Sequence, residues 1–365
     1  MPTLPSPSRE PRLSIVVDVG AHEVAAHHAI ACALAQTGLA PGDVEVIAVA
    51  DGTRPGMAEA LVTDDRIRVV TARDSGQAAA CNAGFAASRG RLVLFLDAED
   101  TLYPEAASEV LAAWEPGISK VQFLLDLVDA GGRMLGRQVP RELHDVEAPA
   151  LLRLGGAYGS PPGSGNAYDR DFLARVMPLD EGLWRTGADS VPILLAPLHG
   201  RVMSLPLALG AYRLHRHGGD DPALVVDSRG GTLYTEARRI RQGREAVAAE
   251  LARLGAGEAG PAGLAPWDAR TLVLCARFGN DATRAELRPS PTAVMAQALR
   301  SVWQWPLITT RRRLLLSLWM LSVWLLPGPL AHRAAQWHRR SAGAVDPHLS
   351  ARTAAARLGS LAVRP

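Results

Sequence analysis

Hydrophobic and polar positions alternate between two kinds of segment in the first hundred residues. Short apolar runs rich in β-branched residues, as in strands, stand at residues 13–19, 44–50, 66–70 and 91–96. Between them lie alanine-rich stretches of helical composition, which end at Gly38 and Gly90. The run "RLVLFL" is apolar without interruption, as in strands that are buried on both faces. This alternation predicts an α/β fold with a largely parallel sheet that is flanked by helices.

Acidic residues follow two of these predicted strands directly. Asp51 comes after the second strand, and Asp97, Glu99 and Asp100 come after "LVLFL". Ligands of parallel α/β sheets bind at the carboxyl ends of the strands. Crowded carboxylates repel one another, and Mg²⁺ or Mn²⁺ would offset that repulsion while keeping positions open for phosphate. The alternative is a solvated acidic turn before a helix that begins near Pro104, where acids favour the helix dipole.

The order of these motifs resembles a known family. "SIVV", "VEVIAVADGT" and "DSGQAAACNAGFAASRGRLVLFLDAEDTLYP" are similar to the family 2 glycosyltransferases, which have the GT-A fold. The similarity covers residues 13–115 and extends with fewer matches to residue 217. It implies an inverting enzyme that moves a sugar from a nucleotide-diphosphate donor to a hydroxyl of a glycan or lipid-linked acceptor.

The resemblance also implies roles for individual residues. Asp51 and Gly52 would bind the nucleotide of the donor, with Asp51 hydrogen-bonded to the base. Asp97 and Glu99 would form the motif that binds Mn²⁺ or Mg²⁺ and the diphosphate. Asn82 and Gly84 match an Asn-x-Gly helix that supports the site by packing. In full, the resemblance implies nucleotide-sugar binding at Asp51, Gly52, Asp97, Arg213 and His215, metal binding at Asp97 and Glu99, and catalysis at Asp189.

The acceptor side is expected in the second hundred residues. A hairpin is predicted at residues 118–140, turning at "AGG", and a Gly/Ser/Pro-rich loop follows at residues 155–168. By the resemblance, Asp189 in "GADS" is the candidate general base; the alternative is a helix N-cap. Tyr212-Arg213-Leu214-His215 matches a Tyr-Arg-x-His element of the family, although His215 could equally belong to a solvated basic strand end.

The chain departs from the family pattern at several of these positions. The differing residues are Val19 and Gly20 after the first strand, Ala50 before Asp51, Cys81 before Asn82, Glu99 in place of a second Asp, and Ala188 before Asp189. They leave open a second interpretation, a non-catalytic GT-A-fold binding or assembly subunit of a glycan-synthesis system. A nucleotidyltransferase fits less well, because "DVGAHEVAAHH" has neither the glycine-rich phosphate loop nor a basic residue.

The C-terminal third has a different pattern. Strand signals fade after residue 221 and helical ones continue, and no charged residue stands between Arg313 and His332. Pro327 shortens this apolar segment, and arginines flank it. We expect it to enter one membrane leaflet with Arg311, Arg312 and Arg313 at the headgroups. A helix buried against the catalytic domain and a membrane-spanning helix are the alternatives.

The amino-acid composition limits the number of domains, the kind of partner and the cellular compartment. The 365 residues are 48% hydrophobic with a formal net charge of +2, which suffices for one large or two moderate domains and gives no reason to expect nucleic acid. Three widely spaced cysteines predict free thiols in a reducing compartment, and the N-terminus lacks an apolar signal sequence. We therefore expect a cytoplasmic protein, peripheral or monotopic on the inner face of the cytoplasmic membrane. The expected parts are a disordered tail (1–11), a GT-A-like catalytic domain (12–220), a helical extension (221–310), a membrane-associating segment (311–345) and a flexible tail (346–365).

Overall fold

The protein divides into two compact units. The computed structural model describes residues 10–20, 23–54, 56–61, 64–214, 232–256 and 260–341. The first unit comprises the chain up to Pro149 together with Gly159–Leu214, and the second comprises Ala150–Tyr158 and the chain from His215 onward. Of the tail expected at residues 1–11, residues 1–9 lie outside the described residues. The tail expected at 346–365, the boundary expected near residue 220 and His215 also lie outside them.

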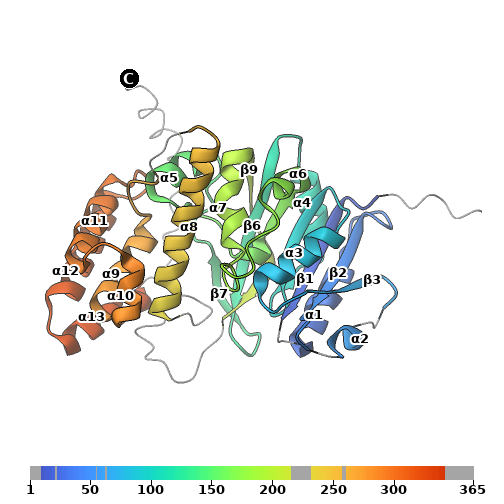
Figure 1. The fold of residues 1–365 in the computed structure, drawn as a ribbon, viewed down its shortest axis with the longest axis horizontal. Coiled ribbons are helices and arrows are strands. Elements are labelled where there is room, and N and C mark those ends of the chain that lie inside the picture. Colours follow the sequence, from blue (N-terminus) through green and yellow to red (C-terminus); the bar gives the residue numbers. More distant parts are fainter. Residues whose placement is uncertain are drawn as a thin grey trace, which may run out of the picture. The chain divides into compact units, whose positions relative to one another are not determined.

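The first unit is built on one mixed sheet (Figure 1). Its strands are β1 (Leu13–Gly20), β2 (Val44–Ala50), β3 (Ile67–Thr71), β4 (Leu92–Asp97), β5 (Thr101–Leu102), β6 (Ile118–Val128), β7 (Met134–Val139), β8 (Asn166–Asp169) and β9 (Arg201–Arg213). Its helices are α1 (Glu23–Leu34), α2 (Met57–Leu61), α3 (Gln77–Ala87), α4 (Ala106–Ala113), the 3₁₀ turn η1 (Gly163–Gly165), α6 (Arg170–Val176) and α7 (Ser190–His199). Helix α5 (Ala148–Gly155) begins in this unit and ends in the second. The predicted α/β class is confirmed, as are the first four strands and the hairpin β6–β7.

Strand order places the carboxyl ends of β1 and β4 side by side. Within the described residues the order is β3-β2-β1-β4-β8-β6-β9-β5, with β7 paired to β6. The expected parallel pairing holds for β3, β2, β1 and β4, whereas β8 runs antiparallel between β4 and β6. The chain order reverses at β1, and such a reversal opens a crevice beyond the strand ends. Asp18 of β1 is paired in register with Asp97 of β4 at this point.

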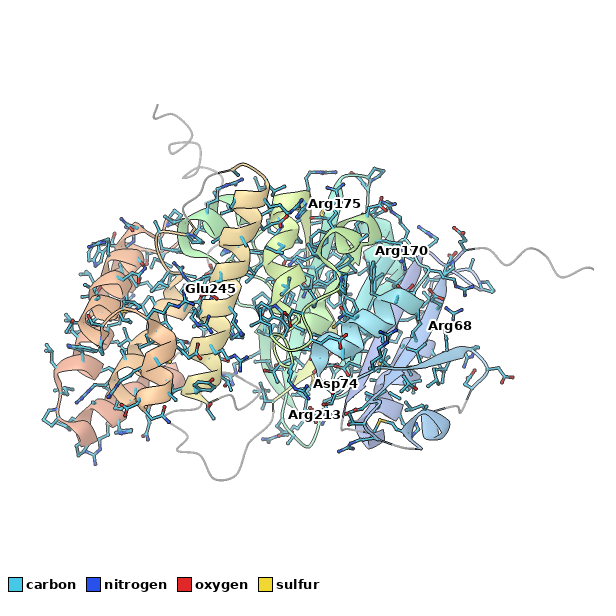
Figure 2. All side chains as sticks on the ribbon, in the orientation of Figure 1. Arg68, Asp74, Arg170, Arg175, Arg213 and Glu245 are labelled. Atoms are coloured by element: carbon cyan, nitrogen blue, oxygen red, sulfur yellow. The ribbon has the colours of Figure 1, made fainter. Side chains whose placement is uncertain are left out.

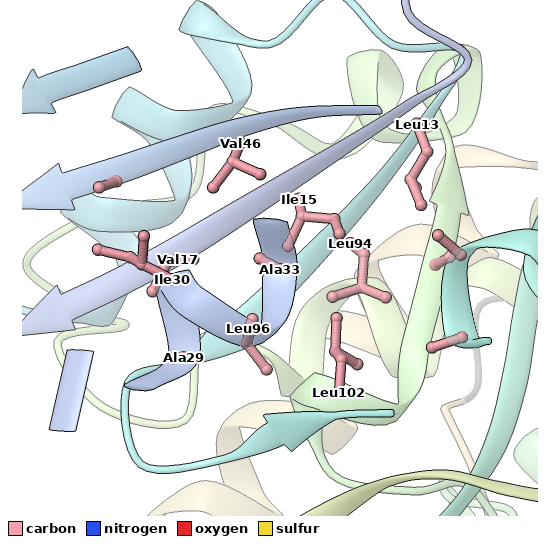
Figure 3. Packing of buried hydrophobic residues seen from close by; sticks show 14 of the residues in the cluster. Leu13, Ile15, Val17, Ala29, Ile30, Ala33, Val46, Leu94, Leu96 and Leu102 are labelled. Carbon is pink, nitrogen blue, oxygen red and sulfur yellow. The ribbon is translucent and has the colours of Figure 1, made fainter. Parts of the chain in front are cut away.

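Alternate residues of the central strands pack on opposite faces of the sheet. Ile15, Val17 and Leu94 belong to the buried cluster that includes Ala29 and Ala33 of α1 (Figure 3). On the other face, α3 approaches the sheet at Gly84, where a Cβ would lie only 2.2 Å from a methyl carbon of Val16. Helices therefore cover both faces, which explains why "RLVLFL" is continuously apolar.

The second unit contains helices throughout its described length. Besides the end of α5, they are α8 (Leu233–Arg253), α9 (Pro266–Phe278), α10 (Asp281–Leu287), α11 (Pro291–Gln304), α12 (Thr310–Leu325) and α13 (Gly328–Ser341). Side chains of Thr232, Asn280, Ser290 and Thr309 each accept a backbone hydrogen bond at a helix N-terminus. Glu245 of α8, labelled in Figure 2, forms ion pairs with Arg241 and Arg288. The expected C-terminal helical extension is thus confirmed. Among the residues that the structure describes, no helix is both long and apolar enough to cross a membrane.

Candidate functional site

A small cavity opens at the carboxyl ends of β1 and β4, and three carboxylates line it. The lining residues are Asp18, Gln77, Cys81, Phe95, Asp97, Gly163, Tyr168, Asp189 and Pro192. Two of the predicted site residues, Asp97 and Asp189, are thus brought together from positions far apart in the sequence. Asp18 was not predicted, because its place near the end of the first strand is visible in the sequence but its register with Asp97 is not.

The cavity has a negative electrostatic environment. Cys81 is buried, and burial raises the pKa of its thiol well above the usual value; the charges of Asp18, Asp189 and Asp97 raise it further. The thiol is therefore protonated and unreactive at neutral pH. The cysteine stands where the related family often has an arginine, so this position supplies no positive charge to the carboxylates around it.

The acidic turn after β4 is organised by hydrogen bonds to Asp100. This residue is only 2% exposed, and its carboxylate accepts hydrogen bonds from the Ser164 hydroxyl (2.7 Å) and the Arg213 backbone N–H (3.1 Å). The Ser164 oxygen in turn accepts from the Asp97 backbone N–H at 3.1 Å. Asp100 therefore fixes the turn, while the Asp97 side chain lines the cavity and Glu99 is half-buried.

Arg213, labelled in Figure 2, stands at the end of β9 and contacts the same turn. Its Nε donates to the Glu99 carbonyl at 3.1 Å, and Nη1 donates to the Ala130 carbonyl at 3.0 Å. The guanidinium thus links the acidic turn to the β6–β7 hairpin. Its predicted contact with the donor remains a prediction.

The oxygen ligands fit a hard divalent cation only in part. Asp97 and Glu99 offer the carboxylates that Mn²⁺ and Mg²⁺ prefer. Across the described part of the chain, however, no three His, Cys, Asp or Glu side chains are grouped closely enough to hold a metal. A metal at Asp97 and Glu99 would therefore need further oxygens, such as those of a diphosphate and water. The donor chemistry is compatible with this arrangement.

The Asp51-Gly52 pair forms a tight turn at the end of β2. Asp51 accepts hydrogen bonds from the backbone N–H (2.9 Å) and hydroxyl (2.7 Å) of Thr53. A Cβ on Gly52 would lie 1.9 Å from the carbonyl oxygen of Ala72, so no other residue fits there without a shift of the backbone. Asp51 is half-buried and is not among the side chains that line the cavity.

Asp189 occupies the N-cap position of α7, but its side chain makes no capping hydrogen bond. Instead, its Oδ2 accepts from the backbone N–H of Gly163 at 3.2 Å. The preceding residue is held by α3, because the Gln77 side-chain carbonyl accepts from the Ala188 N–H at 2.9 Å. Asn82, one turn further along α3, exchanges two hydrogen bonds with the backbone of Leu179. Helix α3 therefore determines where Asp189 lies.

A buried lysine supports the turn that contacts Asp189. Lys120 is 0% exposed, and its Nζ donates to Gln122 Oε1, Ser160 Oγ and Asn166 Oδ1 at 2.8–2.9 Å. Asn166 in turn donates to the carbonyl of Pro162 at 2.8 Å, directly before η1. Burial lowers the pKa of Lys120 well below its usual value. The signal that the sequence analysis missed is a lysine within the apolar strand "ISKVQFLL".

Comparison with known proteins identifies related sequences. Residues 14–138 match the family described as "Glycosyl transferase family 2". The chain is 32% identical over 196 residues to an uncharacterized glycosyltransferase of Nostoc sp., covering 51% of this chain and 60% of that protein. It is 30% identical over 213 residues to the succinoglycan biosynthesis protein ExoO of Rhizobium meliloti, covering 54% of this chain and 59% of that one. The chain thus spans less than two thirds of either relative.

Among solved structures, S. aureus TarS in complex with UDP is similar at a TM-score of 0.49 with 14% identity. That likeness covers 91% of this chain and 92% of the TarS chain.

Proposed function

We propose that this chain, whose residues 14–138 match the model of glycosyl transferase family 2, is a glycosyltransferase. It would transfer a sugar from a nucleotide-diphosphate donor to a hydroxyl of a glycan or lipid-linked acceptor. The observation that carries the proposal is the cavity where Asp97, at the end of β4, and Asp189, before α7, line the same space. A carboxylate at the donor side and a candidate base at the acceptor side are what such a transfer needs.

In the proposed reaction, Asp189 acts as general base. Its carboxylate takes the proton of the acceptor hydroxyl while the hydroxyl oxygen attacks the anomeric carbon. The bond from that carbon to the diphosphate oxygen breaks as the new glycosidic bond forms, so the configuration inverts and the nucleoside diphosphate departs. The hydrogen bond from Gly163 to Asp189 supports this role, because it orients the carboxylate without removing its charge.

The donor would be bound by residues at the strand ends. We assign the nucleotide to Asp51 and Gly52, and the diphosphate to Asp97, Arg213 and His215. Asp97 and Glu99 would hold Mn²⁺ or Mg²⁺, which when bound would neutralise charge on the diphosphate.

A second candidate function is a non-catalytic subunit of the same fold in a glycan-synthesis system. Ala188 is fully buried where the family often has Glu, and Arg213 already binds two backbone carbonyls. Nucleotide binding without turnover of any donor would favour this alternative.

The proposed site of action is the cytoplasm at the inner face of the cytoplasmic membrane, with the chain peripheral or monotopic. A lipid-linked acceptor would be presented there. The similarity to a succinoglycan biosynthesis protein supports a role in making polysaccharide.

Substitution of the candidate base tests the proposal. Release of nucleoside diphosphate would be measured with a panel of UDP-, dTDP- and GDP-sugars in the presence of a polyprenyl-phosphate-linked glycan. We expect Asp189→Asn to lower kcat by about 10²–10⁴-fold, because an amide cannot accept the proton. Asp180→Asn is the matched control: it lies in the same segment, does not line the cavity, and its side chain accepts from the Leu183 N–H. Equal turnover by wild type and Asp189→Asn would refute the assignment, and no turnover of any donor would refute the transferase proposal.

A further inference from the structure

Helix α12 carries a row of exposed leucines on one face. Leu314, Leu318, Leu321 and Leu325 are 55%, 63%, 38% and 72% exposed, and their spacing of four, three and four residues places them on one side of the helix. Leu315, next to this row, is 52% exposed. We call these five residues the leucine face. Exposed leucines are ordinary when they are single, but a contiguous row indicates an interaction surface.

The opposite side of α12 is buried among the other helices of its unit. Leu316, Trp319, Met320 and Val323 are at most 7% exposed. The helix contacts α9, α11 and α13, and the Trp319 indole N–H donates to the Ala334 carbonyl of α13 at 2.9 Å. Because one side is already packed, α12 can present only the leucine face to a partner.

Basic residues accompany this face, and acidic ones are missing from the sequence around it. Arg311 is exposed and lies one turn before Leu314 on the same side of the helix, and Arg312 is exposed as well. Arg313 differs from the expectation, because it is half-buried and donates to the Trp305 carbonyl at 2.7 Å. From residue 287 to residue 345 the sequence has no Asp or Glu but has eight arginines: Arg288, Arg300, Arg311, Arg312, Arg313, Arg333, Arg339 and Arg340.

A tryptophan lies at the margin of the leucine face. Trp303 of α11 is 46% exposed, and its indole N–H donates to the Ser317 hydroxyl of α12 at 3.1 Å. Tryptophan is favoured at the boundary between lipid and water, because its ring is apolar and its N–H is polar.

We propose that the leucine face docks on an anionic lipid bilayer, with α12 lying in the plane of the interface. The leucines would enter the outer part of one leaflet, while Arg311 and Arg312 would bind lipid phosphates. An apolar helix face and cationic side chains together give the two contributions that stable interfacial attachment requires. The leucine face would be the surface by which the chain attaches to the membrane proposed above. This attachment does not depend on the transfer chemistry.

The charges near the leucine face favour a lipid bilayer over a second copy of this chain as its partner. A second copy would bring the same leucine face and its arginines, but residues 287–345 contain no carboxylate to pair with them. Anionic headgroups supply that charge.

Vesicle flotation of the full chain, without nucleotide, tests the proposal. Vesicles of phosphatidylcholine alone are compared with vesicles that also contain phosphatidylglycerol, at low and high salt. We expect binding to the anionic vesicles that weakens with salt. The double variant Leu314→Ser/Leu318→Ser should bind at least about tenfold more weakly, since it removes apolar surface that enters the leaflet. Leu207→Ser, at a 47% exposed leucine of β9, is the matched control and should bind as wild type does.

A second double variant leaves the leucines intact. Arg311→Gln/Arg312→Gln should lose most of the preference for phosphatidylglycerol while keeping the helical circular-dichroism signal. The proposal is overturned if wild type does not float with anionic vesicles, or if the leucine variant floats equally well. It is also overturned if light scattering shows a dimer that the leucine variant dissociates while no vesicles bind. UDP binding is measured on each protein, so that a failure here is distinguishable from a failure of the proposed function.

Discussion

At the scale of single residues, some side chains of the candidate site could be predicted from the sequence and others could not. Asp97 and Asp189 could be predicted, because acids directly after a buried strand or before a helix stand out in a pattern. Asp18 could not be singled out in the same way, since its importance comes from register pairing with Asp97 across two strands. Lys120 was missed for a related reason: its partners Ser160 and Asn166 lie about forty residues away in the chain.

Lys120 gives a prediction about stability and pH. Lys120→Met removes three buried hydrogen bonds and should lower the free energy of unfolding by roughly 2–3 kcal/mol at neutral pH. Burial lowers the lysine pKa in the folded state, so the unfolded chain binds more protons between that lowered pKa and the usual value of 10.5. Wild-type stability should therefore rise relative to the variant as pH increases through this window.

Urea unfolding of both proteins at several pH values from neutral to alkaline measures this difference. Lys120→Arg is the comparison variant. It keeps a positive charge, but the larger guanidinium does not fit the buried space, so it measures the cost of disturbed packing alone. A gap between wild type and Lys120→Met that stays constant with pH would show that Lys120 does not titrate as its burial implies.

At the scale of elements, α3 links the sheet to the candidate base. Its Gly84 lies against Val16 and Val49, and its Gln77 and Asn82 bind the segment that leads to Asp189. The Asn-x-Gly spacing was visible in the sequence, and its contacts explain why the helix needs these two residue types. Other elements could not be predicted. The short strands β5 and β8 have two and four residues, and they form only because distant strands pair with them.

Gly84→Ala tests the close approach of α3. Alanine raises helix propensity by about 1 kcal/mol, but its Cβ would lie 2.2 Å from Val16 and force the helix away from the sheet. We expect a net loss of roughly 1–3 kcal/mol in thermal or urea unfolding, together with weaker activity, because Asp189 depends on α3. Gly328→Ala is the control, since a Cβ there meets nothing within 4 Å. A variant at residue 84 as stable as wild type would contradict the packing argument.

At the scale of the whole molecule, more of the secondary structure could be predicted from sequence in the first unit than in the second. The first four strands were predictable, because parallel βα units have local signals: a buried apolar run, a helix and a glycine stop. Helices α9 and α10 were not identified separately, since the helical stretches after residue 221 are joined by short connections with few breaks in pattern. The leucine face could not be recognised from apolar content alone. Leucine occupies both the exposed and the buried side of α12, and only the packing of the helix distinguishes them.

We propose that the carboxylates after β4 form part of a nucleotide-diphosphate site. Calorimetric titration of UDP and dTDP into the purified chain, with and without Mn²⁺, tests it most directly, with Asp97→Ala as the variant. Glu105→Ala, an exposed acid just beyond the turn, is the matched control. We predict binding that requires Mn²⁺, that falls at least about tenfold in Asp97→Ala and that is unchanged in Glu105→Ala. If neither nucleotide binds under any of these conditions, or if Asp97→Ala binds as wild type does, the account of the site is contradicted.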